Sequence, residues 1–218
     1  MTSVFEHLAK LKIVPVVALE SADDALNLAD ALVAGGLPVA EITFRTSAAA
    51  SVIQTIAQKR QDVFVGAGTI LTLDHLNAAM DSGAKFGVAP GFNPKIVEAA
   101  QKKEFPFAPG VCTPSEIEAA LAIGCRVLKF FPASVMGGPT ALKAFSAPYL
   151  LTGATFMPTG GISLANVGEY LALPAVFACG GTWIAAQDDL AASRWNDVAA
   201  RCREVVEKTS VFRNALKT

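Results

Sequence analysis

Two kinds of hydrophobic pattern alternate along this chain of 218 residues. Short runs of apolar residues fit buried β-strands, and longer segments with apolar residues at every third or fourth position fit amphipathic helices. The strands are predicted at residues 13–19, 39–44, 63–68, 86–89, 106–109, 126–131, 155–157 and 176–179. The helices that follow them are predicted at residues 22–35, 48–59, 73–83, 94–103, 114–124, 139–145, 164–173 and 196–208.

Start and stop signals support the boundaries of several of these helices. Ser, Asn and Thr side chains cap helix amino termini, proline is favoured in the first turn, and glycine is common just beyond the last turn. Such signals occur at Ser21, at Asn93-Pro94, at Thr113-Pro114, and at Gly35, Gly83 and Gly124. We therefore expect helices that begin directly after these caps and end at these glycines.

The regular alternation of strand and helix predicts the fold class. Eight strand–helix units with no linker between them fit a closed (β/α)8 TIM barrel, an α/β fold forming a single domain over residues 1–218, better than an open doubly wound sheet. The open sheet has some support at residues 66–70, Gly-Ala-Gly-Thr-Ile, which begin like a dinucleotide-binding loop. Leu71 stands where the third glycine should be, so the G-x-G-x-x-G pattern fails.

Composition and charge exclude several classes of protein. Hydrophobic residues make up 52% of the chain and charged residues 17%, which supplies a core and argues against disorder. Lys and Arg total 18 against 19 for Asp and Glu, so we expect neither nucleic-acid binding nor a basic membrane-binding patch. No apolar stretch approaches the roughly 18 residues that span a bilayer, and we recognise no signal peptide. The four cysteines have no C-x-x-C spacing, so we expect reduced thiols in a cytoplasmic protein.

One charged residue, Lys129, interrupts an apolar run at residues 126–133. Its neighbours Leu128 and Phe130 fit a short buried strand. Removal of water favours the neutral, nucleophilic form of an amine, which is the form that makes a Schiff base with a carbonyl substrate. The alternative is a structural lysine whose side chain reaches solvent from the strand end or pairs with an acid.

Further polar residues fall at the carboxyl ends of other predicted strands, which converge on one face of such a barrel. Glu41 lies in an otherwise apolar strand, and a buried carboxyl group suits general acid–base catalysis; a structural ion pair with Arg45 is the alternative. Arg45 offers a planar fork for a carboxylate group, unless it is a surface residue. Thr69 follows the third strand, where threonine is also a common helix cap.

Glycine pairs follow the seventh and eighth predicted strands, at residues 159–161 (Thr-Gly-Gly) and 180–182 (Gly-Gly-Thr). In this fold the same two loops commonly bind phosphate through backbone N–H groups. The alternative is a pair of tight turns that need positive φ angles. Neither His7 nor His75 falls at a predicted strand end, so we expect no metal and no other cofactor.

These segments together resemble the bacterial 2-keto-3-deoxy-6-phosphogluconate (KDPG) aldolases, also called 4-hydroxy-2-oxoglutarate (KHG) aldolases. The resemblance runs in order from about Ile13 to Trp183. It depends on Glu-Ile-Thr-Phe-Arg at 41–45, Gly-Ala-Gly-Thr at 66–69, Lys-Phe-Phe-Pro-Ala at 129–133, Pro-Thr-Gly-Gly-Ile at 158–162 and Gly-Gly-Thr-Trp at 180–183. It implies a metal-free, cytosolic lyase, commonly a homotrimer, that splits KDPG into pyruvate and glyceraldehyde 3-phosphate through a lysine Schiff base.

The resemblance also implies a role for each residue of the predicted site. Lys129 matches the Schiff-base lysine, and Glu41 matches the carboxylate that transfers protons. Arg45 and Thr69 match the residues that hold the pyruvyl carboxylate group. The pocket walls are matched by Pro90, Phe131 and Thr159, and the phosphate site by Gly160, Gly161, Gly181 and Thr182. Ser134 departs from the glutamate that many members carry, which leaves substrate preference open.

Other functions fit the same residues. An aldolase of this family that acts on the galactonate epimer or on unphosphorylated 4-hydroxy-2-oxoglutarate would use the same lysine. A barrel that binds a small phosphorylated metabolite without catalysis is a further alternative. The coexistence of Glu41, Arg45 and Lys129 counts against that alternative.

Overall fold

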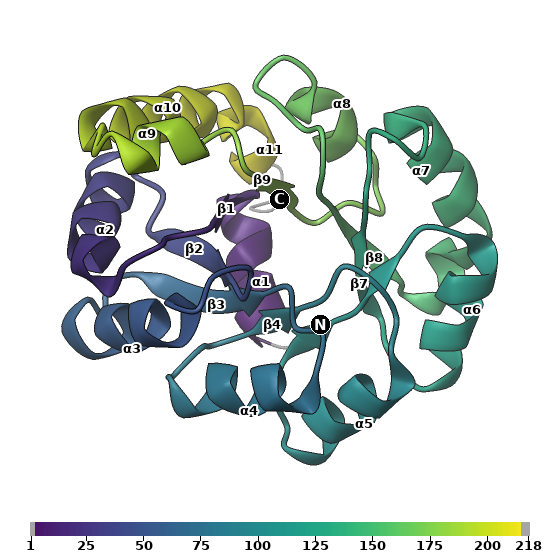
Figure 1. The fold of residues 1–218 in the computed structure, drawn as a ribbon. Coiled ribbons are helices and arrows are strands. Elements are labelled where there is room, and N and C mark those ends of the chain that lie inside the picture. Colours follow the sequence, from purple (N-terminus) through teal and green to yellow (C-terminus); the bar gives the residue numbers. More distant parts are fainter. Residues whose placement is uncertain (1–2, 215–218) are drawn as a thin grey trace.

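Parallel strands form the centre of the molecule, and most of the helices surround them (Figure 1). The computed structural model describes residues 3–214. Six strands pair in the order β5-β4-β3-β2-β1-β9, and three more pair in the order β6-β7-β8. Their bounds are β1 Ile13–Val17, β2 Val39–Thr43, β3 Phe64–Gly68, β4 Gly87–Val88, β5 Phe107–Ala108, β6 Gly110–Val111, β7 Val127–Phe130, β8 Thr155–Pro158 and β9 Cys179–Gly181. This confirms an α/β fold whose parallel strands form a curled sheet.

The two groups of strands adjoin each other in two places. β5 and β6 are separated by Pro109 alone, whose carbonyl oxygen accepts a hydrogen bond from the N–H of Lys129 at 2.8 Å. Near β8 and β9, isolated parallel bridges join Phe156 to Val176 and Thr159 to Gly180. These contacts hold the strands that carry the candidate site residues in one curled arrangement.

The predicted helices are present, with ends that differ by a few residues from the prediction. The first of them is divided into a 3-10 turn, Ala22–Asp24, and α2. Apolar side chains on one face of each helix pack against the strands, as the periodicity requires. The bounds are α2 Ala25–Ala34, α3 Ala49–Lys59, α4 Leu73–Asp81, α5 Pro94–Lys102, α6 Pro114–Ala122, α7 Gly138–Ser146, α8 Val167–Leu171 and α10 Trp195–Lys208.

Three further α-helices were not predicted: α1 Ser3–Leu11, α9 Gln187–Ala191 and α11 Ser210–Asn214. A 3-10 segment, Ala147–Thr152, also follows α7. In α1 the side chains of Phe5 and Leu8 are buried, and in Figure 1 this helix lies inside the ring of outer helices. α1 therefore covers the central strands from one end.

The helix caps behave as expected at three positions. The side chain of Ser21 accepts from the N–H of Asp23, and that of Asn93 accepts from the N–H of Lys95. Thr113 and Glu116 form a capping box at the start of α6, so Thr113 is a structural residue.

The end of α2 differs from the prediction, because Gly36, with φ of 73°, takes the left-handed conformation expected of Gly35. Gly35 instead allows close helix packing, since a Cβ there would overlap the Cβ of Cys202 on α10.

The eighth strand was predicted too early, at residues 176–179. The observed strand, β9, pairs with β1 through Cys179, Gly180 and Gly181, whereas Val176 makes only an isolated bridge. Hydrophobic patterning missed the two glycines because they have no apolar side chain. Gly180 is nevertheless required there, since a Cβ would overlap the Thr159 hydroxyl group.

Within residues 3–214, none of the helices has both the length and the apolar character required to cross a membrane.

Substitution of Gly35 tests the close contact between α2 and α10. Gly35→Ala should lower the free energy of unfolding by about 1–3 kcal/mol, because the new methyl group overpacks this contact. Urea unfolding followed by circular dichroism measures the change. Gly168→Ala on α8 is the matched control, because a Cβ there meets no atom within 4 Å. Equal stabilities of the two variants would contradict the close packing.

Candidate active site

A buried pair of opposite charges lies at the centre of the candidate site. Nζ of Lys129 on β7 lies 2.8 Å from Oε1 of Glu41 on β2. The exposed fraction of the side chain is only 5% for Lys129 and 0% for Glu41. The lysine therefore does not reach bulk solvent, and it pairs with the acid that was predicted beside it. A proton that moves across this contact converts ammonium and carboxylate into amine and carboxylic acid.

The space for the Glu41 side chain depends on a glycine in the neighbouring strand. β2 pairs with β3 so that Thr43 is opposite Gly68, and a Cβ on Gly68 would overlap Oε1 of Glu41. Oε2 of Glu41 is buried and has no hydrogen-bond partner within residues 3–214. Because an unpaired buried oxygen is costly, this atom is suited to contact a bound molecule.

Arg45 is exposed and does not form the alternative ion pair with Glu41. Its Nε donates to the hydroxyl of Thr43 at 3.2 Å, and that hydroxyl donates to the carbonyl oxygen of Val17 at 3.1 Å. Thr43 thus fixes the guanidinium group at the carboxyl end of β2. The sequence analysis did not select Thr43, although alternation along a strand places residues 41 and 43 on the same face.

Thr69 follows β3 directly and does not cap a helix. The cap of α4 is Thr72, whose hydroxyl accepts from the N–H of His75 at 3.0 Å. Thr69 itself has φ of 58°, a strained conformation for a β-branched residue. Such strain is often found at functional sites, where surrounding structure enforces it.

These side chains surround a cavity of about 190 Å³ at the carboxyl ends of the strands. The ring of Phe131 lies beside the amine, with its centroid 5.8 Å from Nζ of Lys129. The hydroxyl of Thr159 is buried and has no partner within the described residues. The cavity is lined by Val16, Glu41, Thr43, Arg45, Thr69, Pro90, Lys129, Phe131, Thr159, Gly160 and Thr182. Sequence analysis thus selected nearly all of its lining, and missed Val16 and Thr43.

Two of the predicted phosphate residues do not line this cavity. Gly161 is exposed, and a Cβ on it would overlap the Cβ of Ser134. Gly181 is buried, and a Cβ on it would overlap the ring of Trp183. Gly160 and Gly161 have φ of 98° and 72°, so these two glycines also form the tight turn that was the alternative interpretation.

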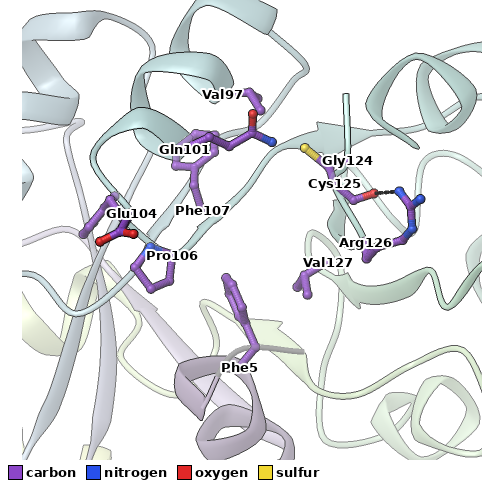
Figure 2. A pocket seen from close by; sticks show the side chains of 11 residues that line it. Phe5, Val97, Gln101, Glu104, Pro106, Phe107, Gly124, Cys125, Arg126 and Val127 are labelled. Carbon is purple, nitrogen blue, oxygen red and sulfur yellow. Dashed lines mark hydrogen bonds between the residues drawn. The ribbon is translucent and has the colours of Figure 1, made fainter. Parts of the chain in front are cut away.

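A larger cavity, of about 550 Å³, lies at the amino ends of the strands (Figure 2). Its lining includes Phe5 of α1 and residues of the segments that precede β5 and β7. Arg126, which also lines this cavity, donates from Nη1 to the carbonyl oxygens of Leu121 and Cys125, at 3.0 and 3.2 Å. Its guanidinium group therefore helps to cap the carboxyl end of α6. No predicted site residue lines this cavity.

Within residues 3–214, no group of three or more His, Cys, Asp or Glu side chains is arranged to hold a metal ion. All four cysteines are free thiols. Burial raises the pKa of Cys125 to about 11. Cys112 is half-buried and does not line the 190 Å³ cavity.

Comparison with known proteins gives consistent results. The family described as KDPG and KHG aldolase matches residues 4–201. The chain is 47% identical to the 2-dehydro-3-deoxy-phosphogluconate aldolase of Haemophilus influenzae, covering 94% of this chain and 95% of that relative. It is 39% identical to the KHG/KDPG aldolase of Escherichia coli, covering 89% and 91%.

A solved structure is also similar to the chain. It is the KDPG aldolase from Legionella pneumophila with pyruvate captured as a covalent carbinolamine intermediate, and it matches with a TM-score of 0.88 at 36% identity. The match covers 94% of this chain and 98% of that one.

Proposed function

The chain belongs to the KDPG and KHG aldolase family, and on this basis we propose how its own residues carry out the reaction of a lysine Schiff-base aldolase. It is a carbon–carbon lyase that cleaves KDPG to pyruvate and glyceraldehyde 3-phosphate. The observation that supports the residue roles best is the buried contact of 2.8 Å between Lys129 and Glu41 in the wall of the 190 Å³ cavity. That contact joins a nucleophile to a proton acceptor.

Lys129 begins the reaction as a nucleophile. Glu41 accepts a proton from the ammonium group, and the neutral amine attacks the C2 ketone of the substrate to form a carbinolamine. Glu41 then returns the proton to the carbinolamine hydroxyl, which leaves as water. The resulting iminium ion is an electron sink beside the bond to be broken.

Cleavage uses the same carboxylate a second time. Glu41 takes the proton of the C4 hydroxyl, the C3–C4 bond breaks, and its electron pair enters the enamine while the aldehyde leaves. Glu41 then protonates C3, and water releases pyruvate from Lys129. Among residues 3–214, Glu41 is the only carboxylate that lines the pocket, so both steps are assigned to it.

The remaining lining residues bind the two ends of the substrate. The guanidinium group of Arg45 and the hydroxyl of Thr69 hold the carboxylate beside the ketone, because both are donors at the pocket edge. Pro90, Phe131 and Thr159 form the walls. Gly160 and Thr182 contact the phosphorylated end directly, and Gly161 and Gly181 set the backbone of the two phosphate-binding loops.

A second substrate, 4-hydroxy-2-oxoglutarate, fits the same chemistry. The relative from Escherichia coli is named KHG/KDPG aldolase, which supports this second activity. Its cleavage to pyruvate and glyoxylate needs the same iminium ion and the same base.

The wider assembly follows from the same premise. We propose a closed (β/α)8 barrel, because β5 and β6 are almost continuous and isolated bridges join β8 and the residue after it to Val176 and to Gly180 of β9. The chain forms one domain, and three copies associate as a homotrimer. The four free thiols favour a cytoplasmic location, where thiols stay reduced.

Reductive trapping tests the nucleophile. Borohydride added with pyruvate should leave a covalent adduct on Lys129, located by peptide mass spectrometry, and Lys129→Ala should abolish turnover. Lys12→Met is the matched control, because Lys12 is the other buried lysine in the described chain, with 8% exposure. An adduct on Lys12 or any other lysine would show that the nucleophile is misassigned.

Exchange of the pyruvate methyl protons tests the acid–base residue. Glu41→Gln should still form the trapped adduct but should slow exchange in deuterium oxide by about 10²- to 10⁴-fold, because the amide cannot transfer the proton. NMR measures the exchange rate. Glu116→Gln, which changes the half-buried capping glutamate of α6, should leave exchange unaffected. Unchanged exchange in Glu41→Gln would remove Glu41 from this role.

Comparison of substrates tests the preference for a phosphorylated end. We expect kcat/KM to be higher for KDPG than for 4-hydroxy-2-oxoglutarate, because the phosphate-binding loops add contacts that only KDPG can make. Steady-state measurements that include the galactonate epimer give the full order. Equal values for KDPG and 4-hydroxy-2-oxoglutarate would mean that these loops do not bind the substrate.

A further inference from the structure

A further cavity, here called the distal cavity, adjoins the 190 Å³ cavity, which is the proposed catalytic pocket. Its volume is about 330 Å³, and it shares Val16, Arg45 and Thr182 with the pocket. The small side chains of three alanines leave its interior open. Its lining consists of Val16, Ala18, Arg45, Thr182, Trp183, Ala185, Ala186 and Gln187. Among the described residues the lining includes hydrogen-bond donors and no carboxylate, which suits a phosphate group.

The segment from Thr182 to Gln187 forms one wall of the distal cavity. The ring of Trp183 lies against Gly181, where a Cβ would overlap it, so the position of Trp183 and the position of the β9 end are linked. Thr182 lies between these two residues and reaches both cavities. Because Thr182 is bonded directly to Trp183, a shift of the Trp183 backbone also displaces Thr182.

A cluster of three charged residues lies beside this segment, outside both cavities, and one of them, Arg201, contacts it. Asp189 of α9 is 8% exposed and accepts from Nε of Arg194 at 2.7 Å and from Nη1 of Arg201 at 2.6 Å. The same Nη1 of Arg201 donates to the carbonyl oxygen of Trp183 at 3.3 Å. Arg201 thus joins α10 to the backbone of the Trp183 segment and to α9 at once.

The chemistry of these contacts favours a fixed geometry. Hydrogen bonds between guanidinium and carboxylate groups are about twice as strong as neutral ones, and a guanidinium group presents its donors in a rigid plane. Hydrogen bonding to Arg194 is the largest cause of the lowered pKa of Asp189, and the charge of Arg201 adds to it. Asp189 therefore stays ionised at neutral pH and keeps both arginines in place.

We propose that Arg201 and Asp189 are positioning residues that hold Thr182 and the wall of the distal cavity for the phosphorylated end of the substrate. This inference rests on the proposed function. The pyruvyl end is fixed separately, by the bond to Lys129 and by Arg45 and Thr69. Loss of Arg201 or Asp189 therefore weakens binding of the phosphorylated end of the substrate and leaves the chemistry at the pyruvyl end intact.

The test separates these two ends of the substrate. In Arg201→Met, KM for KDPG should rise about tenfold, because small displacements of a binding group have large effects. KM for 4-hydroxy-2-oxoglutarate and the rate of pyruvate methyl exchange should stay within about twofold of the wild-type values. Asp189→Asn should act in the same direction, and the double variant should add little, because the two residues act as one unit.

Arg203→Met is the matched control, because Arg203 lies on the same helix and, among the described residues, its side chain donates one hydrogen bond, to the carbonyl oxygen of Ala34 at 3.4 Å, and forms no salt bridge. It should leave all three measurements unchanged. Arg201→Lys keeps the positive charge but removes the planar guanidinium group, so its KM for KDPG should also rise. This variant provides the test if Arg201→Met does not fold.

Two outcomes would overturn the inference: an unchanged KM for KDPG, or an equal loss in KDPG cleavage and pyruvate exchange. Failure of the proposed function is distinct, because wild-type protein would then give no pyruvate adduct.

Discussion

The proposed catalytic chemistry depends on the buried contact between the side chains of Lys129 and Glu41. Removing either charge from water alone would be strongly unfavourable, and the two are tolerated together because they lie 2.8 Å apart. Lys129 and Glu41 are 88 residues apart in the sequence, so only the curled arrangement of β2 and β7 brings them together. The strands thus keep the proposed nucleophile and its proposed proton acceptor in contact before a substrate arrives.

Much of the fold could be predicted from the period of the hydrophobic residues. Strands such as β2 are short and wholly buried, and helices such as α3 have a regular apolar face. β9 was misplaced because Gly180 and Gly181 carry no hydrophobic signal, and their place in the sheet is set by pairing with β1. α9 was missed because five residues, two of them Asp188 and Asp189, show no helical period.

The residues of the candidate site were easier to predict than the residues that hold them in position. Lys129, Glu41 and Arg45 could be selected because each is a charged residue next to a predicted strand end, and parallel strands bring those ends together. The orientation of Gly161 and Gly181 depends on neighbours, Ser134 and Trp183, that no local pattern indicates. Arg201 reads as an ordinary polar residue on the outer face of a helix, and only its contacts with Asp189 and Trp183 connect it to the site.

The missing side chain at Gly68 makes two positions in different strands dependent on each other. Glu41 fills the volume that a side chain at position 68 would occupy, so neither residue can be exchanged freely while the other is kept. A larger residue on β3 would require a shorter acid on β2, and a shorter acid would no longer reach the amine. Moving this carboxyl group to another position therefore requires both strands to be redesigned as a pair.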